Sequence, residues 1–332
     1  MPGTFDRWQS ADAHARPGDI PQRPTRALRQ TVPVPADEPD RIIHADNLSV
    51  LPTLPAGRFT LVYLDPPFNT GRAQARQSTR HVRVTATDAA APAASGTITG
   101  FAGKQYLRVR GDLLRYDDRF EDYWGFLEPR LVEAWRVLAD DGTLYLHLDY
   151  REAHYAKVLL DALFGRECFL NEIVWAYDYG AKAKRKWPTK HDTILVYVKH
   201  PDRYWFDSAA VDREPYMAPG LVTPEKAELG KLPTDVWWHT IVSPTGREKT
   251  GYPTQKPEGI LRRIVQASTR EGDWVLDFFA GSGTTGAVAA TLGRRFVLVD
   301  ENAEAIEVMR ARFTGIAGVE FQEGVRRAAP AG

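Results

Sequence analysis

Residues 274–286 read WVLDFFAGSGTTG, and this stretch decides the fold. An apolar run ends at Asp277, and the glycines at positions 281, 283 and 286 match the spacing G-x-G-x-x-G. Such a loop between a strand and a helix lets a ligand approach the backbone and offers helix N–H groups to an anion. The next apolar run, FVLVD, ends at Asp300, an acid that can bind ribose hydroxyls. The stretch therefore predicts a nucleotide-binding βαβ unit.

Strands and helices alternate on both sides of this unit. Apolar runs typical of buried parallel strands occur at 59–64 and 193–198. Apolar positions at helical spacing occur within 127–138, 153–164 and 257–270. This alternation predicts an α/β fold with a doubly wound, mostly parallel, Rossmann-like sheet.

Composition divides the chain further. The first forty residues are rich in proline and charge and lack an apolar period, which predicts an extended arm. Residues 71–100 show weak periodicity and indicate a long loop. Residues 200–250 are irregular and rich in proline, which indicates an inserted module outside the sheet. The predicted segments are an arm at 1–40, a first half at 41–199 with a flexible basic loop at about 71–111, the module at 200–250, a second half at 251–320 and a C-terminal tail at 321–332.

Composition also excludes several classes of protein. The 332 residues are 43% hydrophobic and 26% charged, as in ordinary globular proteins. No apolar run reaches the roughly 18 residues that cross a membrane, and the N-terminus lacks the apolar core of a secretory signal. Cys168 is the single cysteine, so an internal disulfide and a metal site built on several cysteines are excluded. We expect a cytoplasmic protein without a metal site.

Basic residues are concentrated in two places although the net charge is zero. The range 72–115 holds eight basic residues and two acidic ones. Such clusters can line a groove that follows phosphates, but on charge alone a solvated basic face is the simpler interpretation. The second cluster consists of Lys182, Lys184, Arg185, Lys186 and Lys190.

A second motif, DPPFNT, directly follows the apolar run at 59–64. Its two prolines fix the backbone and remove two N–H donors. The carboxylate of Asp65 and the carbonyl of Pro66 can accept both N–H bonds of a planar amine, while Phe68 stacks on its ring and Pro67 keeps the turn rigid. The alternative is a turn that is only stiffened by proline and capped by aspartate.

Together the motifs resemble the amino-methylating DNA methyltransferases, in the permuted (beta) group whose catalytic motif precedes the cofactor motif. The DPPF motif is similar to their D-P-P-[YF], and residues 277–283 are similar to their F-x-G-x-G loop. The segment GYPTQKP at 251–257 resembles their T-x-K-P segment, which lies against the methionine end of the cofactor. DDRF at 117–120 and LHLDY at 146–150 most closely resemble type III modification subunits. The resemblance covers roughly residues 41–315.

The resemblance implies an enzyme that transfers methyl from S-adenosylmethionine to the exocyclic amino group of a base flipped out of double-stranded DNA. The first half of the chain is then the catalytic half, the module at 200–250 the target recognition region, and the second half the cofactor-binding half. The implied catalytic residues are Asp65, Pro66, Pro67 and Phe68. The implied cofactor-binding residues are Asp46, Thr254, Lys256, Asp277, Phe278, Ala280, Gly281, Gly283, Thr284 and Asp300.

Several alternatives stay open at this point. Adenine N6 is favoured over cytosine N4 because the cytosine enzymes more often have serine where Asp65 stands. Methylation of a ring carbon is disfavoured because no cysteine follows a proline as a nucleophile. A nicotinamide-dependent oxidoreductase would use the glycine loop but leave DPPF unexplained, and a non-catalytic DNA-binding module would need neither motif. Besides DNA, a restriction subunit and a second copy of the chain are the partners that the resemblance allows, with the nucleoid as the place of action.

Overall fold

The structure, a computed structural model, describes most of the chain from residue 38 onward. The first 37 residues, which hold most of the predicted arm, and the last eight residues of the predicted tail lie outside the described part. For three strands only the backbone is described, at residues 72–83, 97–99 and 105–118. Side chains as well as backbone are described at 38–68, 123–180, 182–243 and 245–324.

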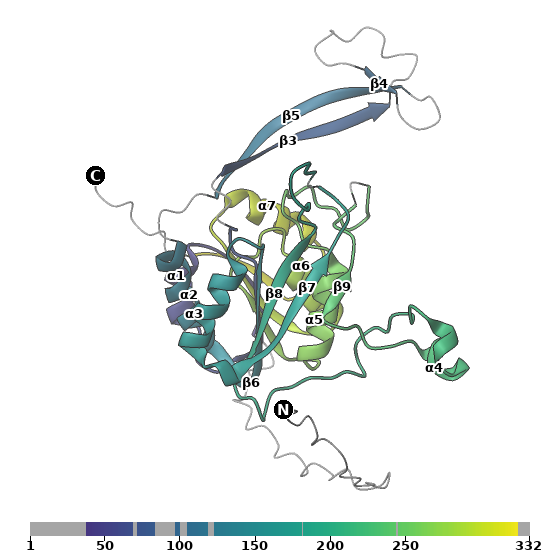
Figure 1. The fold of residues 1–332 in the computed structure, drawn as a ribbon. Helices are drawn as coiled ribbons and strands as arrows, with labels where there is room; N and C mark the ends of the chain where they lie inside the picture. Colours follow the sequence, from purple (N-terminus) through teal and green to yellow (C-terminus); the bar gives the residue numbers. More distant parts are fainter. Residues whose placement is uncertain are drawn as a thin grey trace, which may run out of the picture. The chain divides into compact units, whose positions relative to one another are not determined.

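A nine-stranded sheet runs through the described chain (Figure 1). Its strands are β1 (Asp40–His44), β2 (Phe59–Leu64), β6 (Leu138–Leu148), β7 (Phe169–Ala176), β8 (His191–Val198), β9 (Val236–Trp238), β10 (Trp274–Asp277), β11 (Arg295–Asp300) and β12 (Val319–Glu323). They lie in the order β12-β1-β11-β10-β2-β6-β8-β7-β9. β8 is antiparallel to both of its neighbours, and every other neighbouring pair is parallel. The predicted doubly wound, mostly parallel α/β fold is confirmed.

Helices cover both faces of this sheet and give it two apolar cores (Figure 1). One face carries α1 (Asn47–Val50), α2 (Tyr123–Val137) and α3 (Ala153–Phe164). The other face carries α5 (Glu258–Ser268), α6 (Thr284–Thr291) and α7 (Ala303–Arg312). The remaining helices are α4 (Pro224–Leu229) and the short 3-10 turns η1 (Leu51–Thr53), η3 (Arg166–Cys168) and η4 (Pro219–Leu221).

β2 is buried on both faces, which explains its almost wholly apolar sequence. Val62 and Leu64 belong to one core, whereas Leu61 and Tyr63 belong to the other. Its parallel neighbour β10 comes from the far end of the chain, and Leu276 pairs with Val62. In doubly wound sheets, ligands bind beyond the carboxyl ends of the strands where the strand order reverses. The β2–β10 pair is that place here, so the ends of both predicted motifs meet.

The long loop predicted at about 71–111 contains strands instead. β3 (Arg72–Arg83) pairs antiparallel with β5 (Gln105–Asp118), and β4 (Thr97–Thr99) pairs with the other edge of β5. These strands form a sheet of their own. Backbone pairing does not require apolar alternation, so a search for periodicity could not detect it.

Two short strands correct the predicted segment boundaries. The module at 200–250 is largely irregular, as predicted, but β9 joins the edge of the main sheet beside β7. Residues 321–323, assigned to the tail, belong to β12 and pair with β1. Strands of only three to five residues are too short to establish a periodic pattern.

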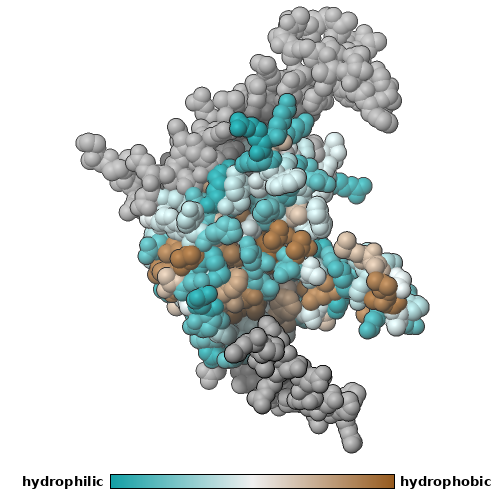
Figure 2. Space-filling view, viewed as in Figure 1, coloured by the Kyte–Doolittle hydropathy of each residue, from teal (hydrophilic) through white to brown (hydrophobic). Residues whose placement is uncertain are grey.

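The surface of the main unit is mixed. In the space-filling view apolar residues are scattered, whereas hydrophilic residues gather above the upper ends of β7 and β8 (Figure 2). No helix in the described part of the chain is long and apolar enough to cross a membrane.

Candidate active site

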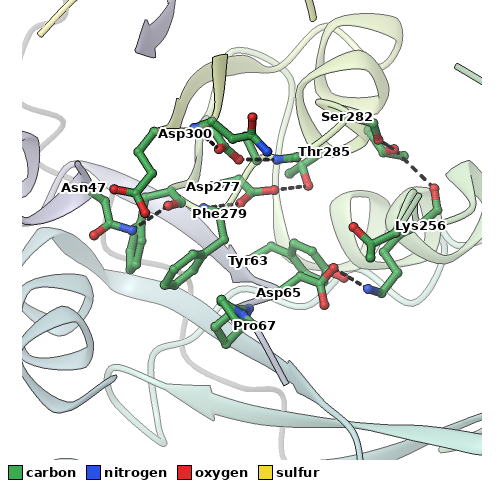
Figure 3. A pocket seen from close by; sticks show the side chains of 18 of the residues that line it. Asn47, Tyr63, Asp65, Pro67, Lys256, Asp277, Phe279, Ser282, Thr285 and Asp300 are labelled. Carbon is green, nitrogen blue, oxygen red and sulfur yellow. Dashed lines mark hydrogen bonds and ion pairs between the residues drawn. The ribbon is translucent and has the colours of Figure 1, made fainter. Parts of the chain in front are cut away.

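A cavity of about 470 Å³ lies at the carboxyl edge of the main sheet (Figure 3). Its walls are built mainly from residues that directly follow four parallel strands, because the carboxyl ends of parallel strands meet at one edge. These residues are Asp46 and Asn47 after β1, Asp65 to Phe68 after β2, Phe278 to Ser282 after β10, and Glu301 and Asn302 after β11. Asp277 and Asp300, the last residues of β10 and β11, also line it.

The cavity brings together nearly all the residues predicted for catalysis and cofactor binding. The four residues of DPPF line it, and so do the predicted cofactor residues, with the exception of Gly283. Gly283 has a φ of +71°, and a Cβ there would lie 2.8 Å from Cγ of Met309. Position 283 therefore requires glycine, because the backbone is left-handed there and α7 packs closely against it.

Asp65 has its two carboxylate oxygens in different surroundings. Oδ2 forms an ion pair with the Nζ of Lys256, which lies 5.0 Å from the centroid of the Phe68 ring. Oδ1 is buried and accepts no hydrogen bond within the described part of the chain. A buried carboxylate oxygen without a donor is costly, so this atom is an acceptor available to a ligand in the cavity.

The carbonyl oxygens of Pro66 and Pro67 also lie in different surroundings. The carbonyl of Pro67 accepts a hydrogen bond of 2.8 Å from the hydroxyl of Tyr123 on α2. No described residue donates to the carbonyl of Pro66. Proline fixes φ and so restricts the backbone that carries the Pro66 carbonyl, while the ion pair with Lys256 holds the Asp65 carboxylate beside it.

The glycine loop is held by the carboxylates at the ends of β10 and β11. The Gly281 N–H donates to Asp300 Oδ2 at 2.8 Å. Asp277 accepts from the Phe279 N–H at 3.0 Å and from the Thr285 hydroxyl at 2.6 Å. Burial, with repulsion from the Asp65 and Asp300 carboxylates, raises the pKa of Asp277 to about 7.

The same loop requires glycine at position 281. Gly281 has a φ of +50°, and a Cβ there would lie 3.1 Å from the ring of Tyr252, which lines the cavity. Burial, followed by the charges of Asp300 and Glu304, raises the pKa of the Tyr252 hydroxyl, so it stays protonated. Tyr252 had no role assigned from the sequence.

A buried polar pair, Arg130 and Asn47, also lines the cavity and was not predicted from the sequence. Arg130 of α2 is 8% exposed, and its Nε donates to Asn47 Oδ1 at 2.7 Å. Asn47 in turn donates to the Phe278 carbonyl at 2.9 Å, which ties α2 to the glycine loop. The available signal was an arginine on the apolar face of α2, between Leu127 and Ala134, because a buried arginine needs partners.

A buried chain of polar groups lies next to Phe68. The Tyr63 hydroxyl is 2.8 Å from His147 Nδ1, and His147 Nε2 is 3.3 Å from Asp192. Burial raises the pKa of Tyr63 well above its usual value. For Asp192 burial opposes ionisation, but hydrogen bonding and attraction from His147 lower its pKa below the usual range. Tyr63, His147 and Asp192 therefore form a continuous buried hydrogen-bonded chain, and the ring of His147 lies 6.0 Å from that of Phe68.

Comparisons with known proteins identify the family of this chain. Residues 59–311 match the N6/N4 family whose description is DNA methylase. The DNA adenine methyltransferase YhdJ of Escherichia coli strain K12 is 30% identical over 280 residues, which cover 82% of each chain. The chain therefore belongs to the N6/N4 DNA methylase family.

Two solved structures share the fold. The M1.HpyAVI–SAM complex superposes with a TM-score of 0.51 at 19% identity, covering 82% of this chain and 98% of that one. The cytosine-N4-specific PvuII DNA methyltransferase superposes with a TM-score of 0.52 at 14% identity, covering 87% and 98%. At such identities the likeness concerns the fold alone.

The raised pKa of Asp277 predicts a pH-dependent stability. An unfolded chain releases this proton near the ordinary aspartate pKa of 3.8, whereas the folded protein keeps it until about 7. The stabilising contribution is therefore present below pH 3.8 and is lost as the pH rises to about 7. Asp277→Asn stays neutral, so we expect it to be more stable than the wild type at about pH 8, by an amount on the order of a few kcal/mol.

Urea denaturation of both proteins between about pH 5 and about pH 8 measures this effect. The exposed Asp202→Asn is the matched control and should follow the wild type at every pH. Equal pH dependence of the wild type and Asp277→Asn would contradict the assignment.

Proposed function

We propose that this DNA methylase transfers a methyl group from S-adenosylmethionine to the N6 amino group of an adenine flipped out of double-stranded DNA. The observation that carries the proposal is that DPPF and the glycine loop line one cavity. Because DPPF precedes the glycine loop in the chain, we place the protein in the permuted, beta group. Its motifs LHLDY and DDRF support a likeness to type III modification subunits.

The lining of the cavity suits S-adenosylmethionine better than a nicotinamide dinucleotide. S-adenosylmethionine carries a sulfonium, an ammonium and one carboxylate, whereas the dinucleotide carries a negatively charged pyrophosphate. The cavity is lined by five carboxyl groups and two basic side chains, which favours a ligand with net positive charge. We assign Asp300 to the ribose hydroxyls, and Lys256 and Thr254 to the methionine end. Asp46 and the loop backbone from Phe278 to Thr284 complete the proposed cofactor site.

The protein's own contribution to the chemistry is to hold the amine. The cofactor supplies an electrophilic methyl group on a sulfonium. Asp65 and the Pro66 carbonyl would accept the two N–H bonds of the base, which favours a pyramidal nitrogen with a localised lone pair. Phe68 would stack on the base, and Asp65 would take up the proton that leaves, directly or through water. The rigid turn holds these groups in place before the base arrives.

Adenine is the proposed target because the motif has aspartate at position 65. A relative named as an adenine methyltransferase, with 30% identity, supports this choice. Cytosine N4 is the alternative, supported by the cytosine-specific enzyme that shares the fold. Both amines would meet the same pair of acceptors.

The segments of the chain then take distinct roles. We propose that 41–199 is the catalytic half, that 251–320 is the cofactor-binding half, and that 200–250 reads the DNA sequence. The last proposal is supported by the irregular backbone of the module and its position between the two halves of the site. Since DNA is the substrate, the protein would act in the cytoplasm at the nucleoid. A restriction subunit and a homodimer remain predictions that co-purification from the host would test.

The cofactor site is tested at Gly281. Gly281→Arg places a side chain against Tyr252 beside the start of α6. Overpacking costs about 1–3 kcal/mol, so affinity for S-adenosylmethionine should fall by at least about fivefold. Gly57→Arg is the matched control, because Gly57 also has a positive φ of +66° but has open space around it. Calorimetry that shows equal affinity in the two variants, or tight binding of a nicotinamide dinucleotide instead, would exclude this site.

The catalytic assignment is tested at Asp65. Asp65→Asn keeps the shape and one acceptor but loses the charge, so single-turnover methyl transfer should slow by about 100-fold or more. Asp65→Ala should be slower still, while cofactor affinity changes little because other residues hold the cofactor. The exposed Asp140→Asn, near the start of β6 and therefore at the edge of the sheet opposite the cavity, should transfer methyl at the wild-type rate. Near-normal transfer by Asp65→Ala would mean that DPPF is only a stiff turn.

The recognition region is tested by exchange. Replacing residues 200–250 with the corresponding region of a relative should change the DNA sequence that is methylated and leave cofactor affinity intact. Long-read sequencing of DNA from the expressing host, scored for modified adenine and cytosine, reads the sequence and the target base together. A folded chimera that still marks the original sequence would place recognition elsewhere.

A further inference from the structure

The segment between β7 and β8 carries a tryptophan that the protein does not pack. In this segment, residues 177–190 and here the β7–β8 loop, Trp187 is 94% exposed. Trp237, in contrast, is 7% exposed, and its Nε1 donates to the Thr234 carbonyl at 2.6 Å. A large apolar side chain gains about 1.5–3 kcal/mol or more from burial, so full exposure of Trp187 leaves a surface ready for a partner.

The β7–β8 loop belongs to the same edge of the sheet as the cavity. Its ends are joined there by hydrogen bonds from the Tyr177 N–H to the Lys190 carbonyl at 2.9 Å and from Lys190 Nζ to the Asp178 carbonyl at 2.8 Å. Although β7 is three strands away from β2 in the sheet, the loop returns toward β2. Lys186 Nζ lies 5.7 Å from the ring of Tyr150, which follows β6, the direct neighbour of β2.

The charge around Trp187 identifies the kind of partner. From residue 179 to residue 191 the chain holds five basic residues and no carboxylate. Hydrophilic residues gather over this end of β7 and β8 in the space-filling view (Figure 2). A cationic loop with an exposed aromatic ring matches a polyanion that also presents flat aromatic bases, which is DNA.

We propose that Trp187 enters the DNA stack and fills the space left by the flipped base, while Lys184, Arg185 and Lys186 contact the flanking phosphates. The inference rests on the proposed methylation of a flipped base. Extrusion of a base breaks stacking and pairing, and an aromatic side chain in the gap restores part of the stacking. A rigid ring next to Pro188 loses little conformational entropy on insertion.

The test uses a duplex that carries the sequence marked in the host, together with a second duplex whose target base is mismatched. Stacking on an aromatic side chain contributes about 1–3 kcal/mol, so Trp187→Ala should slow single-turnover methylation of the matched duplex by at least about fivefold. The mismatch makes extrusion easy, and the variant should there approach the wild-type rate. Trp187→Phe should recover most of the loss.

Two further variants separate stacking from charge. Replacing Lys184, Arg185 and Lys186 together with alanine should weaken DNA binding and reduce the slope of log affinity against log salt by up to about three. Trp187→Ala should leave that slope unchanged. Val158→Ala, which removes an exposed apolar side chain from α3, should alter neither rate nor slope.

The outcomes decide between distinct roles of the loop. A wild-type protein that methylates no DNA would refute the proposed function before any loop variant is made. Wild-type rates for Trp187→Ala on both duplexes would assign the exposed ring to a protein partner and overturn the inference. Equal slowing on both duplexes would mean that Trp187 contacts DNA without filling the gap, which overturns it too. Loss of S-adenosylmethionine binding by Trp187→Ala would indicate a structural role and overturn it as well.

Discussion

The parallel pairing of β2 with β10 is the constraint on which the rest of the structure depends. These strands are separated by more than 200 residues, and their alignment sets which side chains share the cavity. Because Leu276 is level with Val62, Asp277 is level with Tyr63, and Asp65 lies just beyond. A shift by one residue would exchange the two faces of β2, moving Leu61 and Tyr63 out of their core. Burial of both faces therefore fixes the geometry of the site.

Crowding of carboxyl groups is the electrostatic consequence of that alignment. Asp65, Asp277 and Asp300 all approach one cavity because parallel strands end together. The protein stabilises them in different ways: Asp65 has Lys256, whereas Asp277 and Asp300 rely on hydrogen bonds from the loop that they hold. Hydrogen bonds alone do not offset burial, so the pKa values of Asp277 and Asp300 rise. An excess of acceptors and negative charge is then available to a cationic, hydroxyl-bearing ligand.

The sequence predicts those parts of the site that are local in the chain. The DPPF turn and the glycine loop each combine a strand end with the residues that follow it, so their chemistry is visible in a few consecutive letters. Asn47 and Arg130 could not be predicted as a pair, because only the packing of α2 brings them together. Gly283 shows the converse, since a position inside a ligand-binding motif packs against α7.

The main sheet was predictable because buried parallel strands must be apolar on both faces, as in β2. The strands β3 and β5 are interrupted by charged residues and β9 has only three residues, so none of them shows the long apolar run that predicted β2.

Segments outside the buried strands can differ in sequence without changing the site, and this has a functional consequence. On the proposed function, a cavity that receives one flipped base cannot by itself recognise a DNA sequence, since every copy of that base presents the same amine and ring. Phosphates are equally uniform along DNA, so basic side chains give affinity without sequence preference. Recognition of a sequence must therefore come from segments outside the cavity whose side chains reach neighbouring base pairs. On the proposed function, the module at 200–250 supplies these segments, and its strand β9 joins the main sheet beside β7, away from the β2–β10 pair. On the proposed function, the fold thereby separates methyl transfer, which we assign to residues at the ends of the buried strands, from the choice of DNA site, which we assign to the module at 200–250.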